Sequence, residues 1–249
     1  MTSLSQAKYK LFKKLHQKKY REEQKLFIVQ GYKSILDLLS SNYELEALIL
    51  TEQSYNILVD MISQPQLQVF IANERVVTSL STYKNNNFGI AIVKINNEQK
   101  VKLRSEKLTL ALDGISDPGN MGTIFRTALW YNITDIILSP DCVEVFNPKV
   151  IQASMGAFFY LNIQTQNLHD IVRKYTDRCY VTSLHGKSVG EVGKISNGIL
   201  IFGSESAGVS KRVLEGVPTS NHITIPCYNG NIDSLNVSVA CGIILNSVL

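Results

Sequence analysis

The sequence predicts an α/β protein of two units, the second of which is built on a mainly parallel sheet. Apolar stretches of strand length alternate with segments of helical periodicity along the chain. In the second half the strands are continuously apolar, which is typical of parallel strands covered by helices on both faces. A polar stretch at 96–106 interrupts the alternation and suits a linker. We therefore expect a first domain at 1–95 and a second at 107–249.

The first domain opens with a helix. Leu4, Leu11, Phe12 and Leu15 recur at helical spacing, which predicts a helix over 4–24. The elements expected after it are a strand at 25–30, a helix at 32–39, a strand at 45–50, a helix at 53–62, a strand at 66–72, a short helix at 74–80 and a strand at 89–95. This order makes a compact α/β unit.

The second domain continues the alternation to the C-terminal residue. The expected elements are strands at 108–113, 135–138, 161–164, 179–184, 198–202 and 222–226, and helices at 121–131, 148–158, 168–175, after Ser210 and at 234–249. In parallel sheets ligands bind beyond the carboxyl ends of the strands, so the loops at that edge form the candidate site.

Composition excludes several classes of protein. The 249 residues are 45% hydrophobic, which suits a globular chain with a sizeable core. The four cysteines form no C-x-x-C pair and no metal-ligand spacing with histidine, so we expect buried thiols and no metal site. The four histidines have no Ser or Cys motif beside them, which leaves a hydrolytic triad without support. No apolar run approaches the roughly 18 residues of a membrane span, and a cytoplasmic location is expected.

The net charge of +4 is concentrated near the N-terminus. The first 25 residues carry eight basic and two acidic residues, whereas the other 224 residues sum to −2. A basic arm on a near-neutral body is typical of proteins that bind polyanions, because neutralising phosphates releases counterions. A solvated helix face is the alternative explanation.

Three polar, glycine-containing stretches each follow an apolar strand, at 113–127, 202–210 and 225–239. The first contains Asp117-Pro-Gly-Asn-Met-Gly122, a turn into a helix whose N-terminal amides suit an anion. Arg126 follows about one turn later and points outward. The dinucleotide pattern G-x-G-x-x-G and the phosphate loop G-x-x-x-x-G-K-[ST] are both missing, so nicotinamide and ATP chemistry lack support.

Single residues in the two later stretches also have structural explanations. Glu205 is the one carboxylate in a loop of small residues, and it either holds an arginine or a hydroxyl or caps the helix near Ser210. Ser234 is a candidate N-cap of the last helix, which would place Asn236 in its first turn.

Taken together, the three stretches resemble the signature motifs of the SpoU/TrmH family of RNA ribose 2′-O-methyltransferases, within the SPOUT superfamily. The segments that carry the resemblance, in the family's order and spacing, are 112–138, 202–210, 225–226 and 234–240. Residues 10–31 resemble, less specifically, the substrate-binding domain of the same enzymes, which has a fold like that of ribosomal protein L30e. The resemblance implies an L30e-like RNA-binding domain followed by an α/β-knot domain, a deep trefoil knot in which the C-terminal segment threads a loop.

The resemblance also implies the site residues. The catalytic set it implies is Asn120, Arg126, Glu205, Ser234 and Asn236. S-adenosylmethionine is the implied cofactor, bent within the knot and held largely by backbone groups, and the residues in contact with it would be Gly203, Ile225 and Leu235. RNA binding by the first domain would use the basic residues of the arm, namely Lys13, Lys14, Lys18, Lys19 and Arg21. A homodimer is implied and no metal is required.

Each catalytic residue has an expected role. Arg126 would activate the ribose hydroxyl, although an arginine base is chemically awkward, so orientation and anion stabilisation weigh equally with proton removal. Asn120 would position Arg126 or the ribose, and Glu205 would hold the arginine or its own loop. Ser234 and Asn236 would complete the pocket at the start of the last helix.

Two features depart from the family pattern, and other functions stay open. Ser206 stands where glycine often follows the acidic residue, and 227–233 is one residue longer than is common.

A catalytically silent RNA-binding protein on the same scaffold is one alternative, and a methyltransferase that acts on a base is another. By the same resemblance the extra N-terminal domain favours ribosomal RNA as the substrate, and a transfer RNA ribose methyltransferase is a further alternative.

Overall fold

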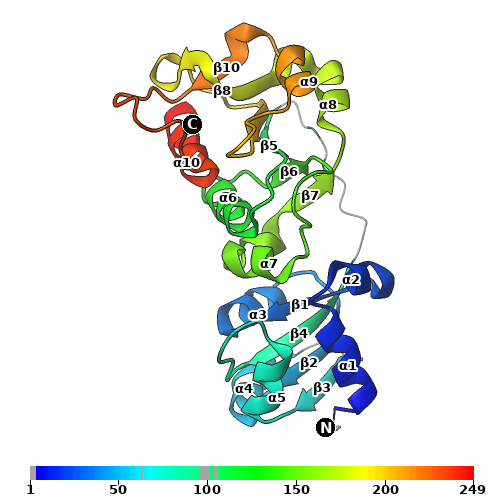
Figure 1. Ribbon diagram of the computed structural model, residues 1–249. Coiled ribbons are helices and arrows are strands. Elements are labelled where there is room, and N and C mark those ends of the chain that lie inside the picture. The colour runs from blue at the N-terminus through cyan, green and yellow to red at the C-terminus, as the bar shows by residue number, and fades with distance from the viewer. Residues whose placement is uncertain (1–3, 63, 65, 96–100, 102, 104–105) are drawn as a thin grey trace. The chain divides into compact units, whose positions relative to one another are not determined.

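The computed structural model describes residues 4–62, 64, 66–95, 101, 103 and 106–249 (Figure 1). The chain folds into two compact units. The first takes in the chain up to residue 97 together with Glu144–Phe159, and the second takes in 98–143 and Tyr160–Leu249. The predicted α/β class is confirmed, because each unit carries its own sheet with helices packed on it.

The two units do not coincide with the predicted domains. Residues 144–159 belong to the first unit, although the sequence pattern assigned them to the second domain. The predicted linker at 96–106 lies mostly outside the described residues. Two of its described residues, Val101 and Leu103, pack with the hydrophobic core of the second unit.

The first unit holds a four-stranded mixed sheet of order β1-β4-β2-β3. Its strands are β1 (Leu26–Gln30), β2 (Leu45–Leu50), β3 (Gln68–Ile71) and β4 (Gly89–Lys94). Strand β4 is antiparallel to β1 and β2, and β2 is parallel to β3. The helices that follow strands β1 to β3 are α3 (Tyr32–Leu39), α4 (Glu52–Leu58) with the 3-10 turn η1 (Val59–Met61), and α5 (Glu74–Leu80). Thr51 and Asn73 cap the starts of α4 and α5, each accepting a backbone N–H three residues on.

The long helix predicted over 4–24 is wrong, because the structure has two helices there. Helix α1 (Gln6–Lys14) starts at the capping Ser5, and α2 (Lys18–Gln24) follows a break at 15–17. At the break the Leu15 side chain is fully buried, and its carbonyl accepts a 2.8 Å hydrogen bond from Nη1 of Arg21. Helical periodicity alone cannot reveal a break that a tertiary contact stabilises.

The helix predicted over 148–158 is also divided. Helix α7 (Pro148–Ser154) ends at Met155 and Gly156, which have positive φ angles of 48° and 91°, and the 3-10 turn η2 (Ala157–Tyr160) follows. A residue with a Cβ would be strained at the φ of Gly156, so this turn favours glycine.

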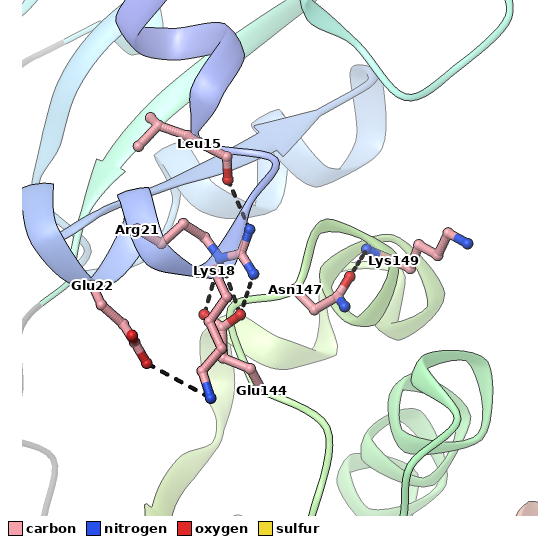
Figure 2. Close-up of polar contacts among 7 residues, drawn as sticks. All are labelled: Leu15, Lys18, Arg21, Glu22, Glu144, Asn147 and Lys149. Atoms are coloured by element: carbon pink, nitrogen blue, oxygen red, sulfur yellow. Dashed lines mark hydrogen bonds and ion pairs between the residues drawn. The ribbon is translucent and has the colours of Figure 1, made fainter.

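Residues 144–159 pack against the rest of the first unit through aromatic rings and one buried ion pair. The ring of Phe27 in β1 lies with its centroid 4.9 Å from that of Phe146 and 5.9 Å from that of Phe158. Arg21, 2% exposed, donates from Nε to both carboxylate oxygens of Glu144, at 2.9 and 3.1 Å, and from Nη2 to one of them. Figure 2 shows this guanidinium between Glu144 and the Leu15 carbonyl, bonded to both.

The second unit holds a six-stranded sheet of order β10-β8-β9-β5-β6-β7 in which every pairing is parallel. Its strands are β5 (Leu108–Asp113), β6 (Asp135–Leu138), β7 (Asn162–Thr165), β8 (Cys179–Ser188), β9 (Gly198–Gly203) and β10 (His222–Thr224). Its helices and 3-10 turns are α6 (Pro118–Trp130), α8 (Leu168–Tyr175), η3 (Thr176–Arg178), η4 (Val189–Glu191), α9 (Lys211–Gly216), η5 (Thr219–Asn221) and α10 (Val237–Val248). The predicted parallel sheet is confirmed. Figure 1 shows α6 beside α10, and the two helices pack together.

The described residues hold neither a helix able to cross a membrane nor a cluster of metal ligands. No helix in the described part of the chain is both long and apolar enough for a span. In the same residues, no group of three or more His, Cys, Asp or Glu side chains is placed to hold a metal ion.

Candidate functional site

The three polar stretches lie at the carboxyl ends of β5, β9 and β10. Strands β5 and β9 are neighbours, with Asp113 paired to Gly203 at their ends, so the first two stretches leave the sheet side by side. The buried carboxylate of Asp113 accepts a 2.8 Å hydrogen bond from the backbone N–H of Ser210. This bond ties the end of the second stretch to the start of the first.

The first stretch begins α6 three residues before the predicted start. Asp117 caps the helix by accepting the backbone N–H of Asn120 at 2.8 Å, and Pro118 occupies the first turn, where its missing N–H costs nothing. Helix α6 packs its apolar face inward through Met121, Ile124 and Phe125. The cap therefore fixes where Asn120 leaves the helix.

The Asn120 side chain links all three stretches. Its Nδ2 donates to Oε1 of Glu205 in the second stretch, and its Oδ1 accepts a 2.9 Å hydrogen bond from Nδ2 of Asn236 in the third. Three of the five predicted catalytic residues thus form one hydrogen-bonded chain, although 116 positions separate Asn120 from Asn236.

Glu205 sits in a closed turn and does not act as a helix cap. Ser204 and Gly208 exchange backbone hydrogen bonds of 3.1 and 2.9 Å around it. The turn depends on Gly203, because a Cβ there would lie 2.0 Å from the Gly208 carbonyl carbon. The Glu205 carboxylate accepts from Asn120, and the backbone N–H of Ser210, the N-cap of α9, donates to Asp113, so Glu205 does not cap this helix.

The third stretch ends in α10, whose N-cap is Asn236 and not Ser234. Oδ1 of Asn236 accepts the backbone N–H of Ser238 at 2.9 Å and that of Val239 at 3.4 Å. The helix starts at Val237, three residues later than predicted. One amide therefore both caps α10 and reaches Asn120.

The segment before α10 makes no backbone-to-backbone hydrogen bonds among the described residues. Across the described residues, no backbone-to-backbone hydrogen bond involves any residue from Ile225 to Leu235. All ten residues of 227–236 are exposed, and they include Tyr228 at 97%, Ile232 at 65% and Leu235 at 45%. Apolar side chains beside backbone groups that no other backbone group satisfies suit a ligand with an apolar ring and polar edges.

Arg126 and Ser234 lie outside the hydrogen-bonded chain. Both side chains are exposed, and within the described part of the chain neither makes a hydrogen bond or ion pair. Of the three predicted cofactor contacts, Gly203 is buried, Ile225 is half-buried and Leu235 is exposed.

Sequence reasoning missed two residues at this edge. One is Asp113, whose carboxylate holds the loop at Ser210; the signal for it in the sequence is an acidic residue that ends an apolar strand. Cys227 is exposed, so the prediction of a buried thiol is wrong for it. Hydrogen bonds from the backbone N–H groups of Gly230 and Asn229 lower the pKa of Cys227, whereas burial raises the pKa of Cys179 to about 11 and that of Cys241 to about 12.

The basic arm in the first unit divides into exposed lysines and one buried arginine. Lys13 and Lys14 lie over the rings of Tyr9 and Tyr20, at 5.9 and 5.0 Å from the ring centroids. Lys18 pairs with Glu22 at 3.7 Å on the solvated face of α2, and Lys19 is exposed.

The buried residue of the arm is Arg21. Its guanidinium is committed to Glu144 and the Leu15 carbonyl, so the expectation that it contacts RNA does not fit its position. Its place within a run of basic residues concealed this structural role.

Comparison with known proteins connects this geometry to a family. Residues 107–246 match the model of the SpoU rRNA Methylase family, and residues 6–91 match that of the MRM3-like substrate binding domain. The chain is 27% identical over 247 residues to the 23S rRNA (guanosine(2553)-2'-O)-methyltransferase RlmP of Bacillus subtilis, a match that covers 98% of this chain and 96% of the relative.

Solved structures agree. A protein from Porphyromonas gingivalis assigned to the TrmH family superimposes with a TM-score of 0.87 at 31% identity, covering 99% of this chain and 98% of that one. The AdoMet-bound rRNA methyltransferase from Sinorhizobium meliloti superimposes with a TM-score of 0.87 at 26% identity, covering 100% and 96%. With a family model that spans most of the second half and a matched substrate-binding domain before it, the chain belongs to the SpoU rRNA Methylase family.

Proposed function

We propose that the chain is an S-adenosylmethionine-dependent methyltransferase that modifies a ribose 2′-hydroxyl in ribosomal RNA. The observation that carries the proposal is the hydrogen-bonded chain Asn236–Asn120–Glu205, which joins the three motif loops at one edge of a parallel sheet. Family membership supports methyl transfer to RNA, and the relatives named above support ribosomal RNA. A cytoplasmic location and the knotted course of the C-terminal segment belong to the same proposal.

The residues at this edge fit S-adenosylmethionine. The backbone groups of the segment Ile225–Leu235 form no backbone-to-backbone hydrogen bond in the described part of the chain, and exposed apolar side chains lie beside them. Gly203, Ile225 and Leu235 would hold the cofactor, which supplies an electrophilic methyl group on a sulfonium.

Arg126 would act on the RNA side of the reaction. A guanidinium stays protonated, so its chemistry here is to orient the ribose and to stabilise the oxyanion as the hydroxyl loses its proton. Positioning of the oxygen for in-line attack supplies several kcal/mol of such a barrier. Asn120, held at both its amide nitrogen and its amide oxygen, would present a fixed amide to the ribose or to Arg126. The Glu205 carboxylate would hold the arginine, and Ser234 would complete the pocket.

We include a homodimer in the proposal because Arg126 has no partner within its own described chain. Exposed apolar side chains on α6 and α10 support it, with Trp130 at 86%, Val239 at 50% and Ile243 at 37% exposure. The arginine of one protomer would then serve the Asn120–Glu205 pair of the other.

Co-expression of two inactive variants tests the shared site. If Arg126 acts across the interface, a mixed dimer of Arg126→Ala and Glu205→Ala chains contains one intact site and regains methyl transfer. If both residues act within one protomer, the mixed dimer stays inactive, and light scattering distinguishes that result from a failure to dimerise.

The function itself is tested by incubation with labelled methyl donor and either ribosomal or transfer RNA from a strain that lacks the gene. Label in ribosomal RNA supports the proposal, and label only in transfer RNA changes the substrate. Label in neither pool contradicts a catalytic role. Titration calorimetry with S-adenosylmethionine then distinguishes two explanations for missing label. An enzyme tested with the wrong RNA still binds the cofactor, whereas a catalytically silent RNA-binding protein need not bind it. Arg126→Ala should abolish transfer and leave cofactor affinity nearly intact.

A further inference from the structure

Two buried polar side chains that take no part in the proposed reaction lie at the carboxyl end of β5. Asp113, the last residue of β5, is 7% exposed. Ser139, 4% exposed, directly follows β6, the strand beside β5 (Figure 1). A buried polar group is costly unless it is hydrogen-bonded, so the contacts of these two side chains show what they stabilise.

Ser139 fixes the chain where it leaves β5. Its Oγ accepts the backbone N–H of Gly114 at 2.9 Å. Its own backbone N–H donates to the Leu112 carbonyl at 2.9 Å, and the N–H of Val143 donates to the Ile115 carbonyl at 2.8 Å. These bonds hold the chain before, at and after Gly114, at the start of the first motif stretch.

Asp113 fixes the second motif stretch, on the other side of β5. Its backbone pairs in register with Gly203, the last residue of β9. Its Oδ2 accepts the backbone N–H of Ser210 at 2.8 Å. The loop that carries Glu205 is therefore held at both its ends by one residue of β5.

The two stretches come together at Gly114. Its φ is 69°, and a Cβ there would lie 3.9 Å from the Cβ of Ser204. Glycine is the residue with the greatest backbone freedom, so the hydrogen bond to Ser139 restricts a turn that would otherwise be loosely defined. Ser204 directly precedes Glu205, whose carboxylate accepts from Asn120. The turn that Ser139 fixes thus lies next to the loop that presents the acidic residue.

We propose that Ser139 and Asp113 are positioning residues for methyl transfer, which set the hydrogen-bonded chain Asn236–Asn120–Glu205 from the two sides of β5. Both act through the backbone, because each bonds to a main-chain N–H group of a motif stretch. A shift of about 1 Å in a reacting constellation can cost about 100-fold in rate, so a small movement of either stretch is enough. The inference rests on the proposed function and adds to it two residues buried beneath the site.

Kinetics with the methylated RNA pool and the full-length protein tests the role. Ser139→Ala and Asp113→Ala should each lower kcat by about 10- to 100-fold, with the KM for RNA unchanged because the basic arm is intact. Asp113→Asn keeps an oxygen that can accept the same N–H, so it should recover most of the turnover. If Asp113→Asn is as slow as Asp113→Ala, the carboxylate acts through its charge, and the positioning role is wrong for Asp113.

A buried serine elsewhere in the chain is the matched control. Ser54 in α4 is 2% exposed, and its hydroxyl lies 2.8 Å from that of Thr51, in the first unit. Ser54→Ala should lower the melting temperature without lowering kcat. A merely structural role for Ser139 would give Ser139→Ala the same result.

Hydrogen exchange followed by mass spectrometry gives a readout that needs no activity. Ser139→Ala should speed exchange in peptides that cover 114–120, and Asp113→Ala should speed it in peptides that cover 204–210, while peptides from α8 exchange as in the wild type. Wild-type exchange of both loops, or wild-type kcat in both alanine variants, overturns the proposal. If the wild type methylates neither RNA pool, the proposed function fails, and the exchange rates still decide whether the two side chains fix these loops.

Discussion

Removing the Glu144 carboxylate should destabilise the first unit strongly, because it leaves the buried charge of Arg21 without a counterion. The Arg21 side chain is 3% exposed and that of Glu144 is 15% exposed. In Glu144→Ala the guanidinium keeps only the Leu15 carbonyl, and two charge-assisted hydrogen-bond acceptors are lost.

The expected size of the effect follows from this burial. Breaking a buried ion pair by removing one partner costs about 3–5 kcal/mol. For a chain of this length each kcal/mol lowers the melting temperature by roughly 2–4 °C, so a fall of about 6–20 °C is expected. Such a change is a large part of the roughly 5–15 kcal/mol that separates folded from unfolded protein.

Thermal unfolding followed by circular dichroism measures this shift. The matched control is Glu44→Ala, which removes the same carboxylate from the exposed pair with Lys94, whose side chains are 54% and 39% exposed. Water and salt screen an exposed pair, so this variant should melt close to the wild type. The double variant Arg21→Met with Glu144→Leu should recover most of the stability, because it leaves no buried charge.

Two results would refute this reasoning. One is a Glu144→Ala variant that melts no lower than Glu44→Ala, since the pair would then behave as a solvated one. The other is a double variant no more stable than Glu144→Ala, which would assign the loss to packing and not to charge.

Three further predictions concern the site in the second unit. Gly203→Ala should lower both the melting temperature and methyl transfer, because its Cβ would lie 2.0 Å from the backbone of the turn that presents the acidic residue; an active, stable variant would contradict that crowding. Asn236→Ala should lower the free energy of unfolding by about 1 kcal/mol, because α10 loses its N-cap, and should also lower methyl transfer strongly. Full methyl transfer by this variant would show that Asn236 caps the helix without serving the site. Iodoacetamide at pH 8 should label Cys227 before Cys179 and Cys241, since a lowered pKa gives more thiolate at that pH and raised pKa values give less; mass spectrometry that finds equal labelling would contradict the assignment.

Much of the fold could be predicted because its signals are local. The strands at 45–50, 108–113 and 135–138 and the helix at 168–175 have the predicted bounds, since apolar runs and helical periodicity are properties of neighbouring residues. The parallel second sheet followed from the continuous apolarity of its strands.

What could not be predicted depends on contacts between distant residues. Leu15 and Arg21 break the first helix through a turn that Glu144 stabilises from 123 positions away. The same contact, with the packing of Phe27 on Phe146, moves residues 144–159 into the first unit.

The candidate site divides in the same way. The resemblance identifies the motif residues of the site. The hydrogen bonds that join Asn120 to Glu205 and Asn236 connect residues far apart in the sequence, so no local pattern predicts them. Asn236 as N-cap was missed because Ser234, two residues earlier, is an equally good capping residue type.

The central claim is methyl transfer to a ribose hydroxyl, and alkaline hydrolysis of the labelled RNA tests it most directly. A 2′-O-methyl group removes the hydroxyl that attacks the neighbouring phosphate, so the bond on its 3′ side survives alkali. After incubation with the protein and labelled methyl donor, the label should appear in alkali-stable dinucleotides and should be absent with the Arg126→Ala variant. Label recovered in mononucleotides would place the methyl group on a base and contradict the account.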